Sequence, residues 1–271
     1  MTTSIKDRAR AFHALHRGGP ILVLANVWDA ASARVFELAG APAVATTSSG
    51  LSATLGFPDG ERVPCELVIG AVRRITATID IPLSVDFERG YAETPAGVAA
   101  NVQAVIDAGG IGINLEDGLA EPRVLVEKIA AIRALPAARE IGFFVNARTD
   151  AFLRGKGGLA DQLADAIRRL QIYEAAGADG LFVPGAADPE TIAAIVRAVR
   201  LPVNVMAFEG VPPAKELERL GVARVSVGAG PMRATLGLVR RIAGELLGAG
   251  TYEGFVRDTP SHVEVNGMFK R

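Results

Sequence analysis

The chain has 271 residues, of which 49% are hydrophobic and 22% charged, and its formal net charge at pH 7 is −1. This balance gives no indication of a nucleic-acid or membrane-surface partner. The polar N-terminus lacks the apolar core of a signal peptide, and no apolar run approaches the ~20 residues of a membrane span. We therefore expect a cytoplasmic protein without a membrane partner.

The residues that most often bind metals or act as bases are scarce. A single cysteine, Cys65, excludes an internal disulfide and a cysteine-based metal cluster. The three histidines, His13, His16 and His262, all lie near the ends of the sequence. A histidine base or metal ligand in the middle of the fold is therefore not expected.

Short apolar runs alternate with helical patterns along the whole chain. Residues 4–17 have the apolar spacing of an amphipathic helix, which Gly18-Gly19-Pro20 ends. The strand-like runs then follow at 21–27, 43–49, 83–91, 112–117, 142–149, 180–185, 202–207 and 224–230. Each is followed by a helical pattern, at 30–39, 64–79, 94–108, 123–134, 159–176, 189–199, 214–220 and 232–248. After the second strand, residues 50–60 read as a Gly-rich loop.

Eight βα units favour a (β/α)8 TIM-type barrel over an open doubly wound sheet. No GxGxxG follows the first strand, which weakens the dinucleotide-binding alternative. We predict one barrel domain over residues 1–271, with 1–18 as an N-terminal helix. The tail 251–271 has no clear place in a single barrel, and either covers the barrel or reaches a neighbouring subunit.

Polar residues recur where the predicted strands end, which is the catalytic face of such a barrel. In the run LSVDFERGY (83–91), Asp86 and Glu88 share a face because strand side chains alternate. The other polar strand ends are Asn26, Trp28, Thr47, Ser48, Ser49, Asn114, Glu116, Asp117, Asn146, Arg148, Asp150, Asn204 and Ser226. Seven of the eight strands contribute to this set, which predicts a site.

The residue types indicate the chemistry. Asp86, Glu88 and Glu116 bring together negative charges that need a divalent cation, and oxygen ligands favour Mg²⁺ or Mn²⁺ over zinc. Arg148 suits a substrate carboxylate or phosphonate. The run TTSSG (46–50) offers hydroxyl and backbone N–H groups to an anionic group. Together they predict a small oxyacid chelated by a metal, which would stabilise enolate-like charge.

Five motifs resemble the isocitrate lyase/phosphoenolpyruvate mutase superfamily. They are SSGLSATLGFPDGE (48–61), VDFERGY (85–91), GINLEDG (112–118), NARTD (146–150) and GVARVSVG (221–228). The resemblance implies a (β/α)8 barrel whose C-terminal helix is exchanged with a partner, giving a homodimer or homotetramer. It also implies Mg²⁺, an α-oxo acid substrate and cleavage or formation of C–C or P–C bonds.

The resemblance also implies roles for single residues. Asp86 would bind the metal directly, while Glu88, Glu116 and Asp59 would hold metal-bound waters. The substrate carboxylate would be held by Ser48, Ser49, Gly50 and Arg148, with Trp28 as a wall of the pocket. Asn204 and Ser226 match strand-end positions of the family and would contact the substrate. Arg148 and Glu116 would take part in catalysis, and Tyr91 is a candidate proton donor, with a packing role as its alternative.

Three departures from the family pattern limit what it implies. The Lys-Lys-Cys-Gly-His loop of the true lyases is replaced by EDGLAEPRVLVEKI (116–129), and Cys65 is expected to be a buried small residue at a helix start. The longer gating loop of the phosphonate mutases is also absent. The usual Asp-x-Asp reads Asp86-Phe87-Glu88, whose second carboxylate reaches one methylene further.

Three functions remain open on this basis. The first is a Mg²⁺-dependent lyase that cleaves or decarboxylates a small α-oxo or 2-hydroxy acid, outside the isocitrate and methylisocitrate lyases proper. The second is phosphonopyruvate hydrolysis or carboxyphosphonoenolpyruvate mutase chemistry, against which the short loop after Asp117 counts. The third is a non-catalytic oxo-acid binding protein, which the absent acid/base loop would suit.

Overall fold

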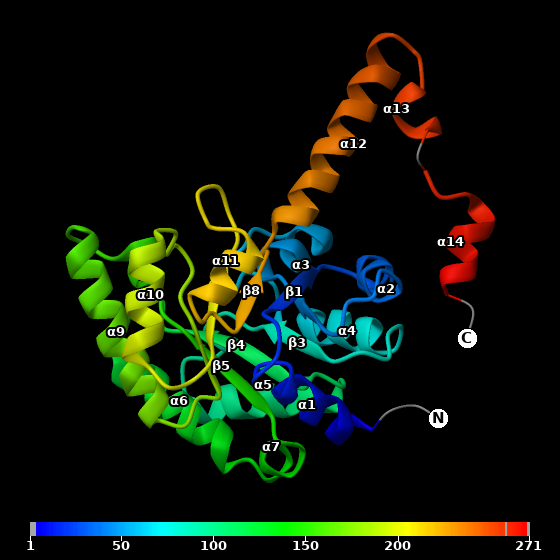
Figure 1. The fold of residues 1–271 in the computed structure, drawn as a ribbon. Helices are drawn as coiled ribbons and strands as arrows, with labels where there is room; N and C mark the ends of the chain where they lie inside the picture. Colours follow the sequence, from blue (N-terminus) through cyan, green and yellow to red (C-terminus); the bar gives the residue numbers. More distant parts are fainter. Residues whose placement is uncertain (1–3, 258, 270–271) are drawn as a thin grey trace.

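The computed structural model describes residues 4–257 and 259–269 and contains a closed parallel barrel (Figure 1). Each strand pairs with the next along the chain, and β8 pairs with β1. The (β/α)8 prediction is confirmed. The strands are β1 (Leu22–Val27), β2 (Val44–Thr46), β3 (Leu83–Asp86), β4 (Gly112–Glu116), β5 (Phe144–Arg148), β6 (Gly180–Phe182), β7 (Val203–Met206) and β8 (Arg224–Ser226).

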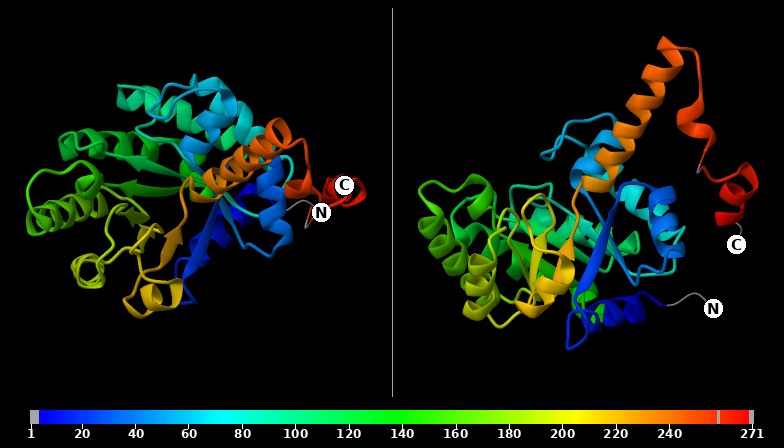
Figure 2. Two further views of the ribbon diagram at one scale, coloured as in Figure 1. Left: turned by 90° about the horizontal axis from the view of Figure 1, so that it is seen from above. Right: turned by 45° about the horizontal axis from the view of Figure 1, so that its top comes forward.

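Helices surround the barrel and follow the predicted ranges within a few residues (Figure 2). The helices that were predicted are α1 (Ile5–Ala14), α2 (Ala30–Leu38), α4 (Cys65–Thr76), α5 (Pro95–Asp107), α6 (Pro122–Ala134), α9 (Leu159–Ala175), α10 (Pro189–Ala198), α11 (Ala214–Arg219) and α12 (Gly230–Gly248). Those that were not predicted are α3 (Ser48–Leu55), α7 (Pro136–Ile141), α8 (Ala151–Arg154), α13 (Glu253–Val256) and α14 (His262–Met268).

The prediction of a Gly-rich loop over 50–60 is wrong for its first half, because α3 begins at Ser48 and ends at Leu55, with Gly56 as its C-cap. Gly50 lies in the first turn of this helix and serves close packing rather than a loop. A Cβ there would stand 2.8 Å from the Trp28 Cβ and 2.6 Å from the Thr47 Cγ2. The glycine therefore lets α3 start directly above the barrel mouth.

The inside of the barrel is apolar at its N-terminal end and polar above. Leu22, Leu24, Ala45 and Phe144 fill the lower layer, and α1 closes it from below with Ala9 and Phe12. The predicted N-terminal helix therefore plugs the barrel. The next layer consists of buried polar side chains, which are Asn26, Ser84, Asn114, Asn146, Asn204 and Arg224.

Helix α12 leaves the barrel, and α13 and α14 continue from it as an arm beside the body (Figure 1). Where α12 turns away, Val23 on the outer side of β1 is 50% exposed. Val239 on α12 is 54% exposed, as is Leu236. Arg34 of α2 donates from Nε to the Met268 carbonyl of α14 at 2.7 Å. Parts of the predicted tail, residues 258 and 270–271, lie outside the described residues.

Among the described residues, no helix combines the length and the apolar character that crossing a bilayer would require.

Candidate active site

Asp86 ends β3 at the mouth of the barrel and is held in place from both sides. Its backbone N–H donates to the Thr46 Oγ1 at 2.8 Å, and its Oδ2 accepts the Ser48 N–H of α3 at 2.9 Å. Its other oxygen, Oδ1, is buried and has no hydrogen-bond partner among the described residues. A buried carboxylate oxygen without a donor is unfavourable on its own, so this atom is a natural ligand for a cation.

Glu88 lies in the loop after β3 and is almost fully buried. The Tyr91 hydroxyl donates to its Oε1 at 2.8 Å. Burial raises the pKa of Glu88, an effect that hydrogen bonds oppose and the charges of Asp59 and Asp86 reinforce. Burial and the neighbouring Glu88 also raise the pKa of Tyr91, so its phenol keeps its proton at neutral pH.

The loops around the mouth carry backbone strain. Among the described residues other than glycine, positive φ values occur at Glu61, Glu88, Tyr91 and Leu119, with φ of 57°, 46°, 53° and 62°. All four lie in loops that follow the second, third and fourth strands. Left-handed backbone in such residues is costly and tends to gather at functional sites. These four residues therefore indicate that this side of the barrel mouth belongs to the functional site.

Glu61 holds the strained loop after β3, a role that was not predicted from the sequence. Its Oε1 accepts the N–H groups of Arg89 at 3.0 Å and Tyr91 at 2.8 Å, and its Oε2 pairs with the Arg89 guanidinium at 3.0 Å. The only signal was its place at the end of the motif SSGLSATLGFPDGE. One carboxylate thus fixes the loop that carries Glu88.

Glu116 and Arg148 face each other at the ends of β4 and β5. Their side chains pair at 2.9 Å, and the Arg148 Nε donates to the Oδ1 of the fully buried Asp150 at 2.8 Å. Burial raises the pKa of Glu116 to about 8, against the effect of Arg148. Burial lowers the pKa of Arg148, but Glu116 and Asp150 outweigh it and the net shift is upward. The site therefore contains a fixed cation beside a carboxyl that is mostly protonated at neutral pH.

The N-terminus of α3 provides the donor side of the mouth. The first N–H groups of a helix have no acceptor within the helix. That of Ser48 is used by Asp86, which leaves those of Ser49 and Gly50 for an anion. Trp28 is half-buried and packs against Gly50, where an added Cβ would stand 2.8 Å from the Trp28 Cβ.

The remaining predicted residues lie around this centre. Asn204 and Ser226 are buried on neighbouring strands, with the Asn204 Nδ2 donating to the Ser226 Oγ at 3.3 Å. Asp59 is exposed in the loop after α3 and contributes to the raised pKa of Glu88. Asp117, although next to Glu116, turns outward and accepts from Tyr173 at 2.8 Å and Arg169 at 3.1 Å.

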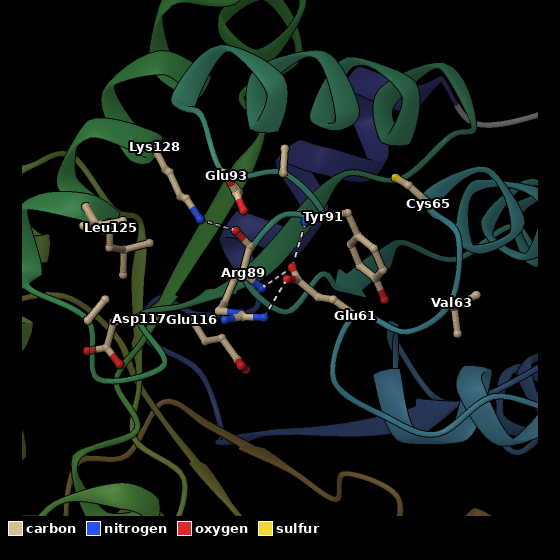
Figure 3. Close-up of a pocket in the computed structure, with 13 residues that line it drawn as sticks. Glu61, Val63, Cys65, Arg89, Tyr91, Glu93, Glu116, Asp117, Leu125 and Lys128 are labelled. Carbon is tan, nitrogen blue, oxygen red and sulfur yellow. Dashed lines mark hydrogen bonds and ion pairs between the residues drawn. The ribbon is translucent and has the colours of Figure 1, made fainter.

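A cavity of about 580 Å³ opens beside the carboxylates, between the loops after β3 and β4 and helix α6 (Figure 3). Glu116 and Tyr91 form the side toward the barrel. Lys128 of α6 is buried and donates from Nζ to the Arg89 carbonyl at 2.6 Å. Cys65 also lines this cavity at the start of α4, but it is half-buried rather than buried as expected. Burial raises the pKa of the Cys65 thiol to about 11, so it stays protonated.

The described residues contain no group of three or more Asp, Glu, His or Cys side chains close enough to hold a metal by themselves. A cation here would therefore have few protein ligands and would keep several waters, which is the usual state of Mg²⁺ in proteins. The Asp86 Oδ1, with the buried Glu88 and the partly exposed Glu116 nearby, fits this arrangement.

Comparisons with known proteins agree with this geometry. The family model described as phosphoenolpyruvate phosphomutase matches residues 12–247. An uncharacterized protein of Mycobacterium tuberculosis (strain ATCC 25618 / H37Rv) is 39% identical over 231 residues, covering 83% of this chain and 84% of the relative. An oxaloacetate decarboxylase of Rhodopseudomonas palustris (strain HaA2) is 31% identical over 229 residues, covering 82% and 78%.

A solved structure, phosphonopyruvate hydrolase in complex with oxalate and Mg²⁺, superposes with a TM-score of 0.85 at 26% identity. The match covers 96% of this chain and 94% of the hydrolase chain. The family model, the relatives and the barrel with its carboxylate-lined mouth lead to one assignment. The protein belongs to the phosphoenolpyruvate phosphomutase family, within the isocitrate lyase/phosphoenolpyruvate mutase superfamily of lyases and mutases.

Proposed function

We propose that this protein is a Mg²⁺-dependent lyase that cleaves or decarboxylates a small α-oxo or 2-hydroxy acid, with oxaloacetate-like diacids as the first substrates to test. The buried Oδ1 of Asp86, which has no hydrogen-bond partner among the described residues, carries this proposal, because it lies beside a fixed arginine and the N-terminal N–H groups of α3. The similarity to an oxaloacetate decarboxylase supports the substrate class.

Asp86 would hold the Mg²⁺ or Mn²⁺ directly, and Glu88, Glu116 and Asp59 would hold its waters. When bound, the cation would supply positive charge that stabilises an enolate-type intermediate. The oxalate and Mg²⁺ bound together in the phosphonopyruvate hydrolase structure support a site of this kind.

The protein groups would orient the acid and manage its protons. Arg148 and the N–H groups of Ser49 and Gly50 would hold the substrate carboxylate, with Trp28 as one wall. Glu116, with its pKa of about 8, can hold or release a proton near neutral pH. The Tyr91 hydroxyl, which donates to Glu88, would donate a proton to the product.

Phosphonate chemistry is the second candidate, and the likeness to phosphonopyruvate hydrolase favours it. The short connection counts against it, since only residues 117–121 join β4 to α6 and no longer segment covers the mouth there. Both activities are therefore tested together.

The experiment incubates the purified protein with Mg²⁺ or Mn²⁺ and oxaloacetate, 2-methylisocitrate or phosphonopyruvate, and follows pyruvate, succinate or phosphate. The matched control is Asp86→Asn, which keeps the shape and an acceptor for the Ser48 N–H. We expect turnover of an oxo or hydroxy acid that EDTA abolishes and that Asp86→Asn lowers at least ~100-fold. The same control corrects for the spontaneous decarboxylation of oxaloacetate.

Other outcomes redirect the assignment. Phosphate release from phosphonopyruvate alone would establish the second candidate. Tight oxalate binding by calorimetry, with no turnover of a wider panel of oxo-diacids and 2-hydroxy acids under either metal, would establish a non-catalytic oxo-acid binding protein and reject the lyase.

We further propose that the chain works in the cytoplasm as a homodimer or homotetramer in which α12 packs on a partner. The exposed apolar side chains of α12 and the half-exposed Val23 on β1 support this assembly. A barrel strand is normally covered by helices on its outer face, and α12 leaves that place open.

A further inference from the structure

Arg224 is the first residue of β8, and its side chain crosses the inside of the barrel. It is 1% exposed, and its NH2 group donates to the Asn114 Oδ1 at 2.9 Å. Asn114 belongs to β4, which is four strands away from β8 in the closed order and thus on the opposite side of the barrel. The guanidinium therefore lies within the barrel, between the apolar lower layer and the mouth.

This buried cation has few partners. The Nε and NH1 atoms of Arg224 are buried and have no hydrogen-bond partner among the described residues. Among the described residues, the other buried arginine outside the mouth is Arg169, which instead pairs with two carboxylates, Asp117 at 3.1 Å and Asp165 at 2.7 Å. A buried charge is costly unless an opposite charge offsets it.

The offsetting charge is that of Asp86. Burial lowers the pKa of Arg224 to about 9, and Asp86 is the group that opposes this shift. Asp86 also lies next to Asn114, the residue that accepts the Arg224 hydrogen bond and is called its anchor, because Asp86 and Asn114 are partners in the β3–β4 register. The Asn114 Oδ1 accepts from the Asn146 Nδ2 at 2.9 Å as well, so the anchor is fixed from β5. Two opposite charges, each with polar atoms that lack a hydrogen-bond partner among the described residues, therefore lie inside the same barrel.

We propose that Arg224 is a positioning residue that acts as an internal counter-charge: it stabilises the negative charge of Asp86 from inside the barrel while no cation is bound at the mouth. The proposal rests on the proposed function in that Asp86 is the cation ligand. Two effects follow from Coulomb's law. Without the Arg224 charge, Asp86 is less stable in the metal-free protein, and a divalent cation binds it more tightly because a competing positive charge is gone.

The first experiment measures Mn²⁺ affinity by electron paramagnetic resonance for the wild type, Arg224→Met and Arg224→Lys. We expect Arg224→Met to bind Mn²⁺ about tenfold more tightly and Arg224→Lys to stay within about twofold of the wild type. Arg133→Met is the matched control, because this arginine pairs with Asp179 on the outside of the barrel. It should leave the Mn²⁺ affinity unchanged. Unchanged or weaker binding in a folded Arg224→Met variant would overturn the proposal.

The second experiment needs no metal and also covers a poorly folding Arg224→Met variant. Urea unfolding is compared, in EDTA, for the wild type, Asp86→Asn, Arg224→Met and the double variant. We expect Arg224→Met to lower the unfolding midpoint less in the Asp86→Asn background than in the wild type, because the charge that needs Arg224 has gone. Equal losses in both backgrounds would reject the counter-charge. A wild type that binds no Mn²⁺ would instead reject the metal site of the proposed function, while the urea experiment still decides the role of Arg224.

Discussion

The Tyr91 hydroxyl donates to the Glu88 Oε1 at 2.8 Å, and both residues have left-handed backbone, with φ of 53° and 46°. Backbone strain of this kind persists only where the surroundings impose it. Here Glu61 imposes it, because its carboxylate accepts the N–H groups of Arg89 and Tyr91. The phenol and the carboxylate are therefore presented to the barrel mouth as one rigid unit.

This relationship makes Tyr91→Phe a direct test of the proton donor. The variant keeps the ring that packs on Phe87 and removes only the hydroxyl. We expect kcat to fall about 100-fold, the scale of losing a general acid, with Mn²⁺ affinity unchanged. Steady-state kinetics and Mn²⁺ titration measure the two effects. A kcat close to that of the wild type would show that Tyr91 has only a packing role.

Arg148 can be tested by a substitution that keeps its charge. Replacing it by alanine would leave Glu116 without its cation and the buried Asp150 with only the exposed Arg154 as its partner, which we expect to destabilise the fold by about 3 kcal/mol. Arg148→Lys keeps the charge but loses the planar pair of donors. We expect it to fold normally and to bind oxalate at least about tenfold more weakly in the presence of Mg²⁺, measured by calorimetry. Wild-type oxalate affinity in Arg148→Lys would mean that another group holds the substrate carboxylate.

The buried His16 should make the free energy of unfolding depend on pH. Burial first, and then the charge of Arg224, lower its pKa from 6.5 to about 3, while its ring stacks on Phe144 at 4.6 Å. The folded protein thus holds His16 neutral, whereas the unfolded chain takes up a proton below about pH 6.5. The free energy of unfolding should therefore fall as the pH drops from about 6.5 toward 3, by up to ~1.4 kcal/mol per pH unit from this group.

The comparison of wild type with His16→Phe isolates this contribution. Urea unfolding at several pH values should give a shallower acid loss for His16→Phe, which cannot take up the proton. His262→Gln is the control, because that side chain is exposed on α14 and hydrated in both states. Identical slopes for wild type and His16→Phe would contradict the prediction.

The exposed face of α12 predicts the oligomeric state. If α12 packs on a partner, placing a charge at Val239 should break the contact because the glutamate would be buried without a partner. We expect the wild type to be a dimer or tetramer by light scattering and Val239→Glu to shift toward the monomer mass. Leu159→Glu, at an equally exposed leucine on α9, should keep the wild-type mass. A monomeric wild type would reject the assembly.

Much of the site could be predicted because strand-end residues follow directly from the βα rhythm. Asp86, Glu116 and Arg148 end β3, β4 and β5, and the parallel register brings such ends to one face. Asn26 shows the limit of this reasoning. It was also a polar strand end, but its side chain is used by the backbone of Thr46, Val227 and Gly228. A polar strand end can thus hold the mouth together without facing a ligand.

The sequence by itself determined the barrel, the family and the carboxylates at the mouth, since these depend on periodicity and local motifs. Tertiary structure alone decided that Glu61 holds the loop of Glu88, and that Arg224 reaches Asn114 across the barrel. Both contacts join residues that are far apart in the chain, by 30 positions for Glu61 and Tyr91 and by 110 for Arg224 and Asn114. Whether a charge at such a position is solvated, paired or buried alone depends on the packing around it, which no local pattern contains.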